Sequence, residues 1–220
     1  VLEIARLDAG VKILVPMYFP AARQLLLMAG ISASRIITQS VDDIYLLDHV
    51  IIPSQRNRDL WLDAESVFLY DSLRLRFGSQ QRGRKIYLSR REFQQKSVAK
   101  RVMRGEDVLV PQLERRGFEV VEPQKLTAVD QIRLFSSAEC ILSQSGSALF
   151  NTVFCYPGTR LIDIESEPHW VRGHVRLFGS RGLRFGAFEG RPDDYSFERP
   201  HQSYTLDVDR LIDRVDDFLM

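Results

Sequence analysis

The stretch Glu139–Phe154 (ECILSQSGSALFNTVF) places a short apolar run, a turn of small polar residues and a helical pattern directly after one another. Glu139–Leu142 predicts a buried strand, because it is short, apolar and followed by turn residues. Ser143–Ser147 predicts the turn, and Ala148–Phe154 predicts a short helix. A strand that leads at once into a helix is the building unit of α/β proteins.

The same alternation of short β-rich runs and helical stretches extends along the chain in both directions. It favours an α/β fold with a mostly parallel sheet. Further strands are predicted at Val11–Val15, Arg35–Thr38, His49–Ile52, Lys85–Leu88, Phe118–Val121 and Arg160–Ile164. Further helices are predicted at Phe19–Ala29, Asp63–Phe77, Glu106–Arg116, Thr127–Ser136 and Val208–Leu219.

The polar stretch Ser79–Arg84 (SQQRGR) carries a loop glycine and marks the predicted domain boundary. A length of 220 residues allows one large domain or two small ones. We therefore predict a first domain over residues 1–78, a second over 79–206 and a C-terminal helix over 207–220. The first residue is Val1 rather than Met, so we expect the first domain to be truncated at its start.

Composition and cysteine usage favour a soluble protein of the cytoplasm. Hydrophobic residues make up 45% and charged residues 27% of the chain, which are ordinary values. No apolar run approaches the roughly 18 residues that a membrane helix needs, and no signal peptide opens the chain. The two cysteines, Cys140 and Cys155, stand in apolar surroundings and predict core residues rather than a disulfide framework.

The formal net charge of +1 argues against a general nucleic-acid binder. That sum hides a separation of charge. The segment Arg74–Arg104 holds eleven basic residues and one acid, which gives it a charge of +10 and leaves −9 for the rest of the chain. Such asymmetry predicts an anionic partner or a solvated surface. One candidate partner is an anionic membrane surface, where each basic residue adds about 1 kcal/mol.

Two predicted strand ends carry residues suited to binding an anion. The first is Ser89-Arg90-Arg91 after the strand Lys85–Leu88, because ligands of open α/β sheets bind beyond the carboxyl ends of the strands. An arginine there offers a planar fork that matches a phosphate. The second is the glycine-containing turn before Ala148–Phe154, where backbone N–H groups at a helix start attract anions.

The alternatives at the second strand end are a plain capped turn and a nucleophilic serine. In the nucleophile interpretation, Ser145 or Ser147 attacks and one of three histidines, His169, His174 or His201, acts as base. The G-x-S-x-G frame of such an elbow is absent. The four histidines also lack the spacing of a metal site, so we predict no metal and no cofactor.

The order of several short motifs resembles glycosyltransferase family 61, which includes bacterial capsular-polysaccharide-type enzymes. In the second domain these motifs are RKIYLSRR (84–91), GFEVVEP (117–123), LFSSA (134–138), SGSALFN (145–151) and PGTRLIDI (157–164). Further stretches that fit are VKILVP (11–16), AGISASRII (29–37), VIIPSQ (50–55), GSRGLRFGAFEG (179–190) and LDVDRLIDRVDDFL (206–219).

The resemblance implies a GT-B arrangement of two Rossmann-like halves, here with an incomplete N-terminal half. The half from about residue 79 would bind a nucleotide-sugar. It further implies a hexosyl- or pentosyltransferase of the bacterial cytoplasm that inverts the anomeric carbon without a metal. The donor would be a UDP-sugar and the acceptor a glycan or lipid-linked glycan, with peripheral membrane contact as an option. The alternative is a non-catalytic module that binds a nucleotide-sugar or a glycan.

Carried over by position, Arg90 would bind the donor diphosphate and the helix start after the glycine would face it. The expected donor-binding residues are Ser89, Arg90, Arg91, Gln144, Ser145, Gly146, Ser147, Ala148 and Asn151. Ser145 replaces a histidine that family members often have. Asp163 stands where the family usually has Glu, and Asp163 or Glu165 is the candidate base within the chain. The family's usual upstream segment has no counterpart here, so the base is alternatively expected to lie upstream.

Overall fold

The computed structural model describes residues 8, 10–15, 20–52, 60–91, 102–166, 168–193 and 202–220. The chain divides into two units, Val1–Arg56 and Asn57–Met220. This division lies earlier than the boundary expected after residue 78. The reason is helix α3 (Ala64–Phe77), which packs against α6 and η3 of the second unit. None of the helices in the described part of the chain is long and apolar enough to cross a membrane.

The first unit is a small parallel β–α–β arrangement. Strands β1 (Ile13–Val15) and β2 (Ile36–Thr38) pair in parallel, with Ile13 opposite Ile36. Helix α2 (Pro20–Met28) and the 3₁₀ turn η1 (Ala33–Arg35) connect them. Among the described residues of this unit, Val15, Ile31 and Ile36 form the buried core.

The strand predicted at His49–Ile52 is wrong. Residues 48–52 form no strand, and Ile52 is 86% exposed. An apolar run becomes a strand only when a neighbouring strand accepts its hydrogen bonds and a core covers one face. In this unit the sheet consists of β1 and β2 alone among the described residues.

The second unit contains a five-stranded parallel sheet with the order β5-β3-β6-β7-β8. Its strands are β3 (Arg84–Leu88), β5 (Phe118–Val121), β6 (Ala138–Gln144), β7 (Arg160–Glu165) and β8 (Arg184–Glu189). A smaller sheet joins β4 (Met103–Arg104), β10 (Tyr204–Thr205) and β9 (Arg191–Pro192). Every pairing within the large sheet is parallel, as the alternation of strands and helices predicts.

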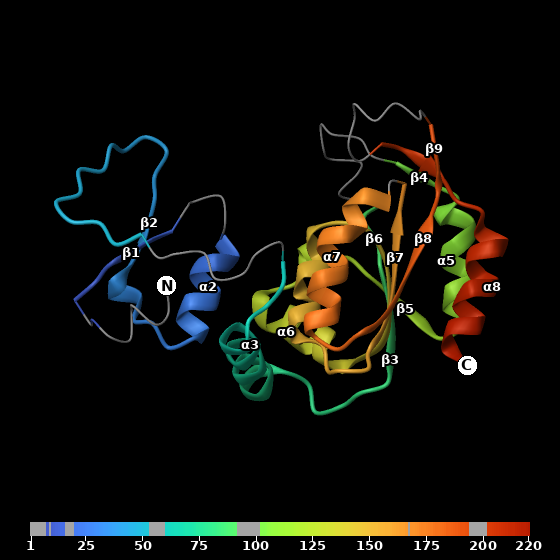
Figure 1. Cartoon of the computed structure of the whole chain (residues 1–220), viewed down its shortest axis with the longest axis horizontal. Coiled ribbons are helices and arrows are strands. Elements are labelled where there is room, and N and C mark those ends of the chain that lie inside the picture. Colours follow the sequence, from blue (N-terminus) through green and yellow to red (C-terminus); the bar gives the residue numbers. More distant parts are fainter. Residues whose placement is uncertain are drawn as a thin grey trace. The chain divides into compact units, whose positions relative to one another are not determined.

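Helices cover both faces of the large sheet (Figure 1). Helices α5 (Glu106–Arg115) and α8 (Val208–Leu219) lie on one face. Helices α6 (Ala128–Ser137) and α7 (Pro168–Ser180) lie on the other, together with α3 and the 3₁₀ helix η3 (Ser147–Phe154). The short 3₁₀ segment η2 (Pro123–Lys125) follows β5. This three-layer arrangement is an α/β fold of the Rossmann-like kind, which confirms the predicted fold class.

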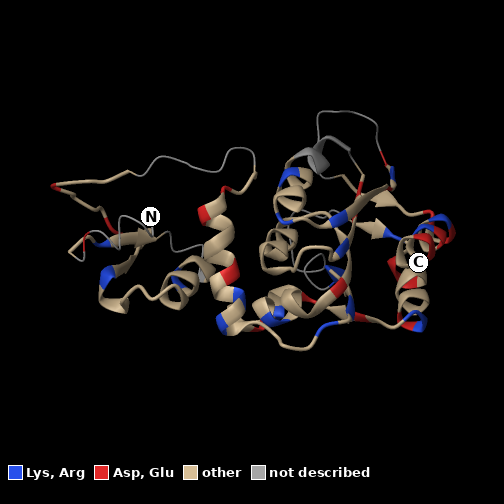
Figure 2. Cartoon of the chain, turned by 60° about the horizontal axis from the view of Figure 1, so that its bottom comes forward, with Lys and Arg blue, Asp and Glu red and all other residues tan. Residues whose placement is uncertain are grey.

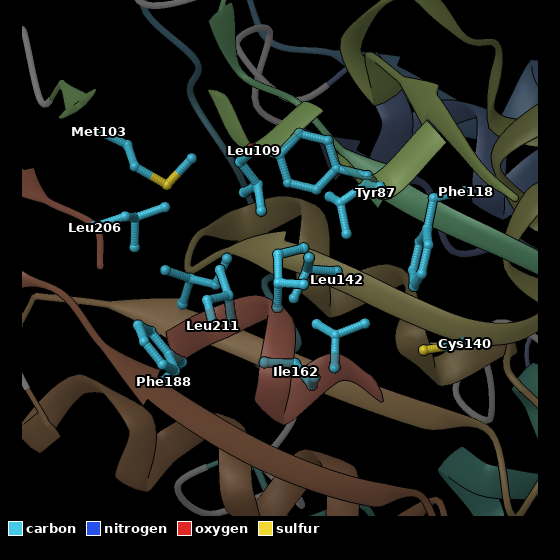
Figure 3. Packing of buried hydrophobic residues seen from close by; sticks show 14 of the residues in the cluster. Tyr87, Met103, Leu109, Phe118, Cys140, Leu142, Ile162, Phe188, Leu206 and Leu211 are labelled. Carbon is cyan, nitrogen blue, oxygen red and sulfur yellow. The ribbon is translucent and has the colours of Figure 1, made fainter. Parts of the chain in front are cut away.

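The main core lies between the sheet and the helices α5 and α8 (Figure 3). Because side chains alternate along a strand, every second residue of a strand faces this core. Tyr87 of β3, Leu142 of β6 and Ile162 of β7 all point into it. Leu211 of α8 closes the core from outside the sheet. The helix at 208–219 is therefore part of the second unit rather than a separate segment.

Helix α7 and strand β8 are the longest described elements that the sequence did not predict. No helix was predicted where α7 begins, at Pro168. Helix α7 contains Gly173 and Gly179, and glycine is a poor helix former. Strand β8 contains Gly186, which weakens a strand pattern in the same way. Packing against η3, β7 and β8 stabilises α7, and pairing with β7 stabilises β8, despite these residues.

Members of the basic segment Arg74–Arg104 have separate partners in the structure. Arg74 is buried and donates to the carbonyl oxygen of Cys155, 2.8 Å away. Arg84 pairs with Glu119, and Arg104 pairs with Asp193. Figure 2 shows the basic residues scattered over several elements. Lys96, Lys100 and Arg101 lie outside the described residues, so membrane contact stays a prediction from the sequence.

Candidate donor-binding site

The strand order reverses direction between β3 and β6. From β3 the chain crosses α5 to β5 at one edge, and then returns over α6 to β6 on the other side of β3. In open parallel sheets this reversal leaves a crevice beyond the carboxyl ends of the two strands, where ligands bind. The two strand ends singled out by their sequence, at Ser89-Arg90 and at Ser145-Gly146, both lie at this crevice.

A pocket of about 220 Å³ opens at this crevice. The described residues that line it come from the ends of β3 and β6 and from the segments η2, α6 and η3. They are Arg90, Pro123, Gln124, Gln131, Gly146, Ser147, Ala148 and Asn151. Arg90 is the only ionisable side chain among them. The structure thus brings five of the predicted donor-binding residues, Arg90, Gly146, Ser147, Ala148 and Asn151, to one pocket.

The four other predicted donor-binding residues are not among the described residues that line the pocket. Ser89, Gln144 and Ser145 are buried, and Arg91 is exposed. Their bonds nevertheless hold the wall in place. The Oγ atom of Ser89 accepts a hydrogen bond from the Arg91 N–H at 3.2 Å, and the carbonyl oxygen of Ser145 accepts one from Arg90 Nη1 at 3.3 Å.

The turn after β6 leads directly into η3. The N–H of Ser145 donates to the carbonyl oxygen of Ile164 at 2.8 Å, so the turn starts as an extension of the β6–β7 ladder. The first N–H groups of a helix lack intrahelical acceptors, which makes a helix start an anion-binding surface. Ser147 and Ala148 occupy that position and line the pocket together with Arg90.

Gln131 of α6 is a pocket residue that sequence reasoning missed. Its Nε2 atom donates to the carbonyl oxygens of Pro123 (3.1 Å) and Leu126 (3.2 Å). Its Oε1 atom accepts from Asn151 Nδ2 at 2.8 Å. One glutamine therefore ties η2 to η3 across the pocket. The available signal was a polar residue directly before the buried Ile132 in an amphipathic helix.

Asp163 and Glu165, the candidate bases, are each only 1% exposed and do not line the pocket among the described residues. Side-chain alternation directs Asp163 to the α7 face of the sheet. There its Oδ2 atom lies 2.8 Å from Nδ1 of His174. Glu165 Oε1 accepts from the backbone N–H of Ser166 at 2.7 Å. A role for either carboxylate as the base stays a prediction.

Ser145, His174 and Asp163 lie together, but their geometry is not that of a hydrolase triad. A working triad uses one ring nitrogen of histidine for the serine and the other for the carboxylate. Here both Asp163 Oδ2 and Ser145 Oγ lie against the same nitrogen, Nδ1, at 2.8 Å and 3.3 Å. If Nδ1 carries the proton that Asp163 accepts, it has no lone pair left to deprotonate Ser145. The cluster therefore supports the turn before Gly146 rather than activating a nucleophile.

The described residues contain no group of three or more His, Cys, Asp or Glu side chains arranged to hold a metal ion. The chemistry that the pocket offers is anion binding, from one guanidinium and a helix start. These groups line one pocket together with the apolar ring of Pro123.

Comparison with known proteins identifies the family. No curated protein matches the chain. The sequence model of the glycosyltransferase 61 family matches residues 5–162. This match covers well over half of the chain, including β1, β3 and the pocket residues from Arg90 to Asn151, and ends just before Asp163. The chain belongs to the glycosyltransferase 61 family.

Proposed function

We propose that the second unit is the donor-binding half of a GT-B-type, inverting glycosyltransferase that works without a metal. It would move a sugar from a UDP-sugar to a hydroxyl of a glycan or lipid-linked glycan in bacterial polysaccharide synthesis. The observation that carries this proposal is the convergence of Arg90 and the η3 start on one pocket at the β3/β6 crevice. Both groups suit a diphosphate.

The leaving group explains why these groups suit transfer. As the bond between the sugar and the diphosphate breaks, negative charge grows on the diphosphate. Fixed donors aimed at that charge lower the barrier, and removing one such donor in other enzymes costs roughly 10²–10³ in rate. Arg90 supplies a fork for two phosphate oxygens, and the backbone at Ser147 and Ala148 supplies N–H groups to the same pocket.

The Arg90→Ala variant tests the proposal. We expect its Kd for UDP, measured by calorimetry, to rise about 10- to 100-fold, since a hydrogen bond to a charged group contributes about 1.5–3 kcal/mol. Transfer and donor hydrolysis should be lost. The matched control is Arg84→Ala, which removes an arginine from the other end of β3, where it pairs with Glu119. Unchanged UDP affinity in Arg90→Ala would overturn the assignment.

A second candidate function is a non-catalytic module that binds a nucleotide-sugar. It is favoured by one observation, the absence of any carboxylate or imidazole among the described residues that line the pocket. An inverting transferase needs a base for the acceptor proton. UDP binding together with release of free sugar or transfer supports the enzyme. UDP binding without turnover on any tested donor supports the module.

A further inference from the structure

Glu106 is a buried carboxylate at the start of α5, only 5% exposed. Gly105 before it has φ +97°, in the left-handed region that favours glycine, which lets the helix begin abruptly at Glu106. A single oxygen of this carboxylate, Oε1, accepts two hydrogen bonds. One comes from Ser89 Oγ at 2.7 Å and the other from Tyr87 Oη at 2.9 Å.

The bond to Ser89 acts directly on the residue before Arg90. The Ser89 N–H also donates to the carbonyl oxygen of Val121 at 2.9 Å, which continues the β3–β5 ladder by one residue. Ser89 Oγ in turn accepts from the Arg91 N–H. The backbone of Arg90 is thus held on both sides, and its guanidinium donates to the Ser145 carbonyl oxygen at the end of β6.

The bond to Tyr87 anchors the same carboxylate to the main core. Burial raises the pKa of Tyr87 well above its usual value, and the charge and hydrogen bond of Glu106 raise it further. Tyr87 therefore remains a hydrogen-bond donor at neutral pH. The Gln144 side chain acts on the Tyr87 pKa in the opposite direction, and its effect is smaller.

Burying a carboxylate destabilises a fold, because removing its charge from water carries a large free-energy penalty. An apolar side chain would pack this position at no such cost. The carboxylate instead accepts hydrogen bonds from two hydroxyl groups. One of them, Ser89 Oγ, belongs to the turn that carries Arg90. We propose that Glu106 is a positioning residue that holds Ser89 and thereby aims Arg90 at the donor diphosphate. This inference rests on the proposed function of the pocket.

UDP affinity and local hydrogen exchange test the inference together. In Glu106→Ala we expect the Kd for UDP to rise about tenfold and the amide of Ser89 and that of Arg91 to exchange faster. Glu106→Gln keeps an oxygen at the acceptor position, so its Kd should stay within about threefold of wild type. Tyr87→Phe removes the other bond to the same carboxylate. It should lower the thermal midpoint while leaving the Kd within about twofold.

A double-mutant cycle shows whether Glu106 acts through Arg90. Arg90→Lys keeps a charge and measurable affinity but loses the planar fork. If Glu106 only aims Arg90, Glu106→Ala should weaken UDP binding much less in the Arg90→Lys background than in wild type. Equal weakening in both backgrounds would overturn the inference, and so would wild-type affinity and exchange in folded Glu106→Ala.

The outcomes separate this inference from the function on which it rests. If Arg90→Ala no longer binds UDP but Glu106→Ala binds it with wild-type affinity, the donor-binding role of the pocket is supported and the positioning role of Glu106 is rejected. If the wild-type chain does not bind UDP, the proposed function falls, and the exchange measurement alone decides whether Glu106 orders the Arg90 turn. Equal exchange at Ser89 and Arg91 in wild type and Glu106→Ala would then reject the role.

Discussion

At the scale of single residues, the site depends on two buried carboxylates that lie on opposite faces of one sheet. Glu106 supports the end of β3 on the α5 face, and Asp163 supports the turn after β6 from the α7 face through His174. Neither lines the pocket among the described residues. Both act on the residue beside a pocket group, Ser89 in one case and Ser145 in the other.

Substitutions of His174 test how much its hydrogen bond to the buried Asp163 carboxylate contributes to the free energy of unfolding. In His174→Leu the buried carboxylate loses its partner, and breaking a buried pair in this way typically costs about 3–5 kcal/mol. His174→Asn can place an amide N–H near the former Nδ1 position, so it should cost distinctly less. Urea unfolding measures both free energies. Equal losses in the two variants would show that ring packing against Phe150 and Phe178, not the hydrogen bond, is what His174 contributes.

At the scale of elements, the start of α6 shows how closely local chemistry follows the sequence. Thr127 caps this helix, with Asp130 in the place of the usual Glu of a capping box. Thr127 Oγ1 accepts from the Asp130 N–H at 3.2 Å. The reciprocal bond differs. The shorter carboxylate of Asp130 binds the Thr127 hydroxyl at 2.7 Å.

Thr127→Ala should destabilise the second unit by about 1 kcal/mol, the usual contribution of an N-cap side chain. Thr127→Ser keeps the hydroxyl and serves as the matched control. Thermal or urea unfolding measures the difference between the two. Because α6 carries Gln131, the Ala variant should also weaken UDP binding slightly if fraying reaches the second turn. A Thr127→Ser loss as large as that of Thr127→Ala would contradict the capping account.

At the scale of the whole molecule, the pocket lies entirely within the second unit. All of its described lining residues fall between Arg90 and Asn151, and the large sheet is complete within residues 57–220. We therefore expect the chain from residue 57 to residue 220 to fold alone, with one cooperative unfolding transition. Its Kd for UDP should lie within about twofold of the full chain. An unfolded product, or loss of UDP binding by a folded one, would contradict this division.

The sequence predicted the parallel sheet and the two strand ends well, because both follow from local signals. Lys85–Leu88 and Phe118–Val121 are apolar runs bounded by turn residues, and Gly117 ends the helix between them. The strand order is not a local property. It follows from which face each crossover helix covers. The sequence therefore could not predict that Arg90 and Gln131 line the same pocket.

Partners of buried polar groups were equally hidden from the sequence. Nothing near Asp163 in the chain marks His174 as its partner, since the pair forms only when α7 packs on β7. Sequence reasoning treated Asp163 and Glu165 as candidate bases at a strand end. Strand alternation would have placed both on one face, but the helix that covers that face, α7, was not predicted.

The turns at the amino ends of the strands lie at the edge of the sheet opposite the pocket. Gly158, in the turn before β7, has open space where a side chain would go, although its φ of +83° is strained for other residues. A spectroscopic label or a short tether attached at the exposed Pro157–Gly158 bend would therefore be remote from the proposed diphosphate-binding groups, Arg90 and the start of η3. Because all strands of the large sheet run in parallel, this bend is a suitable attachment site for immobilising the protein and measuring its activity without perturbing the pocket.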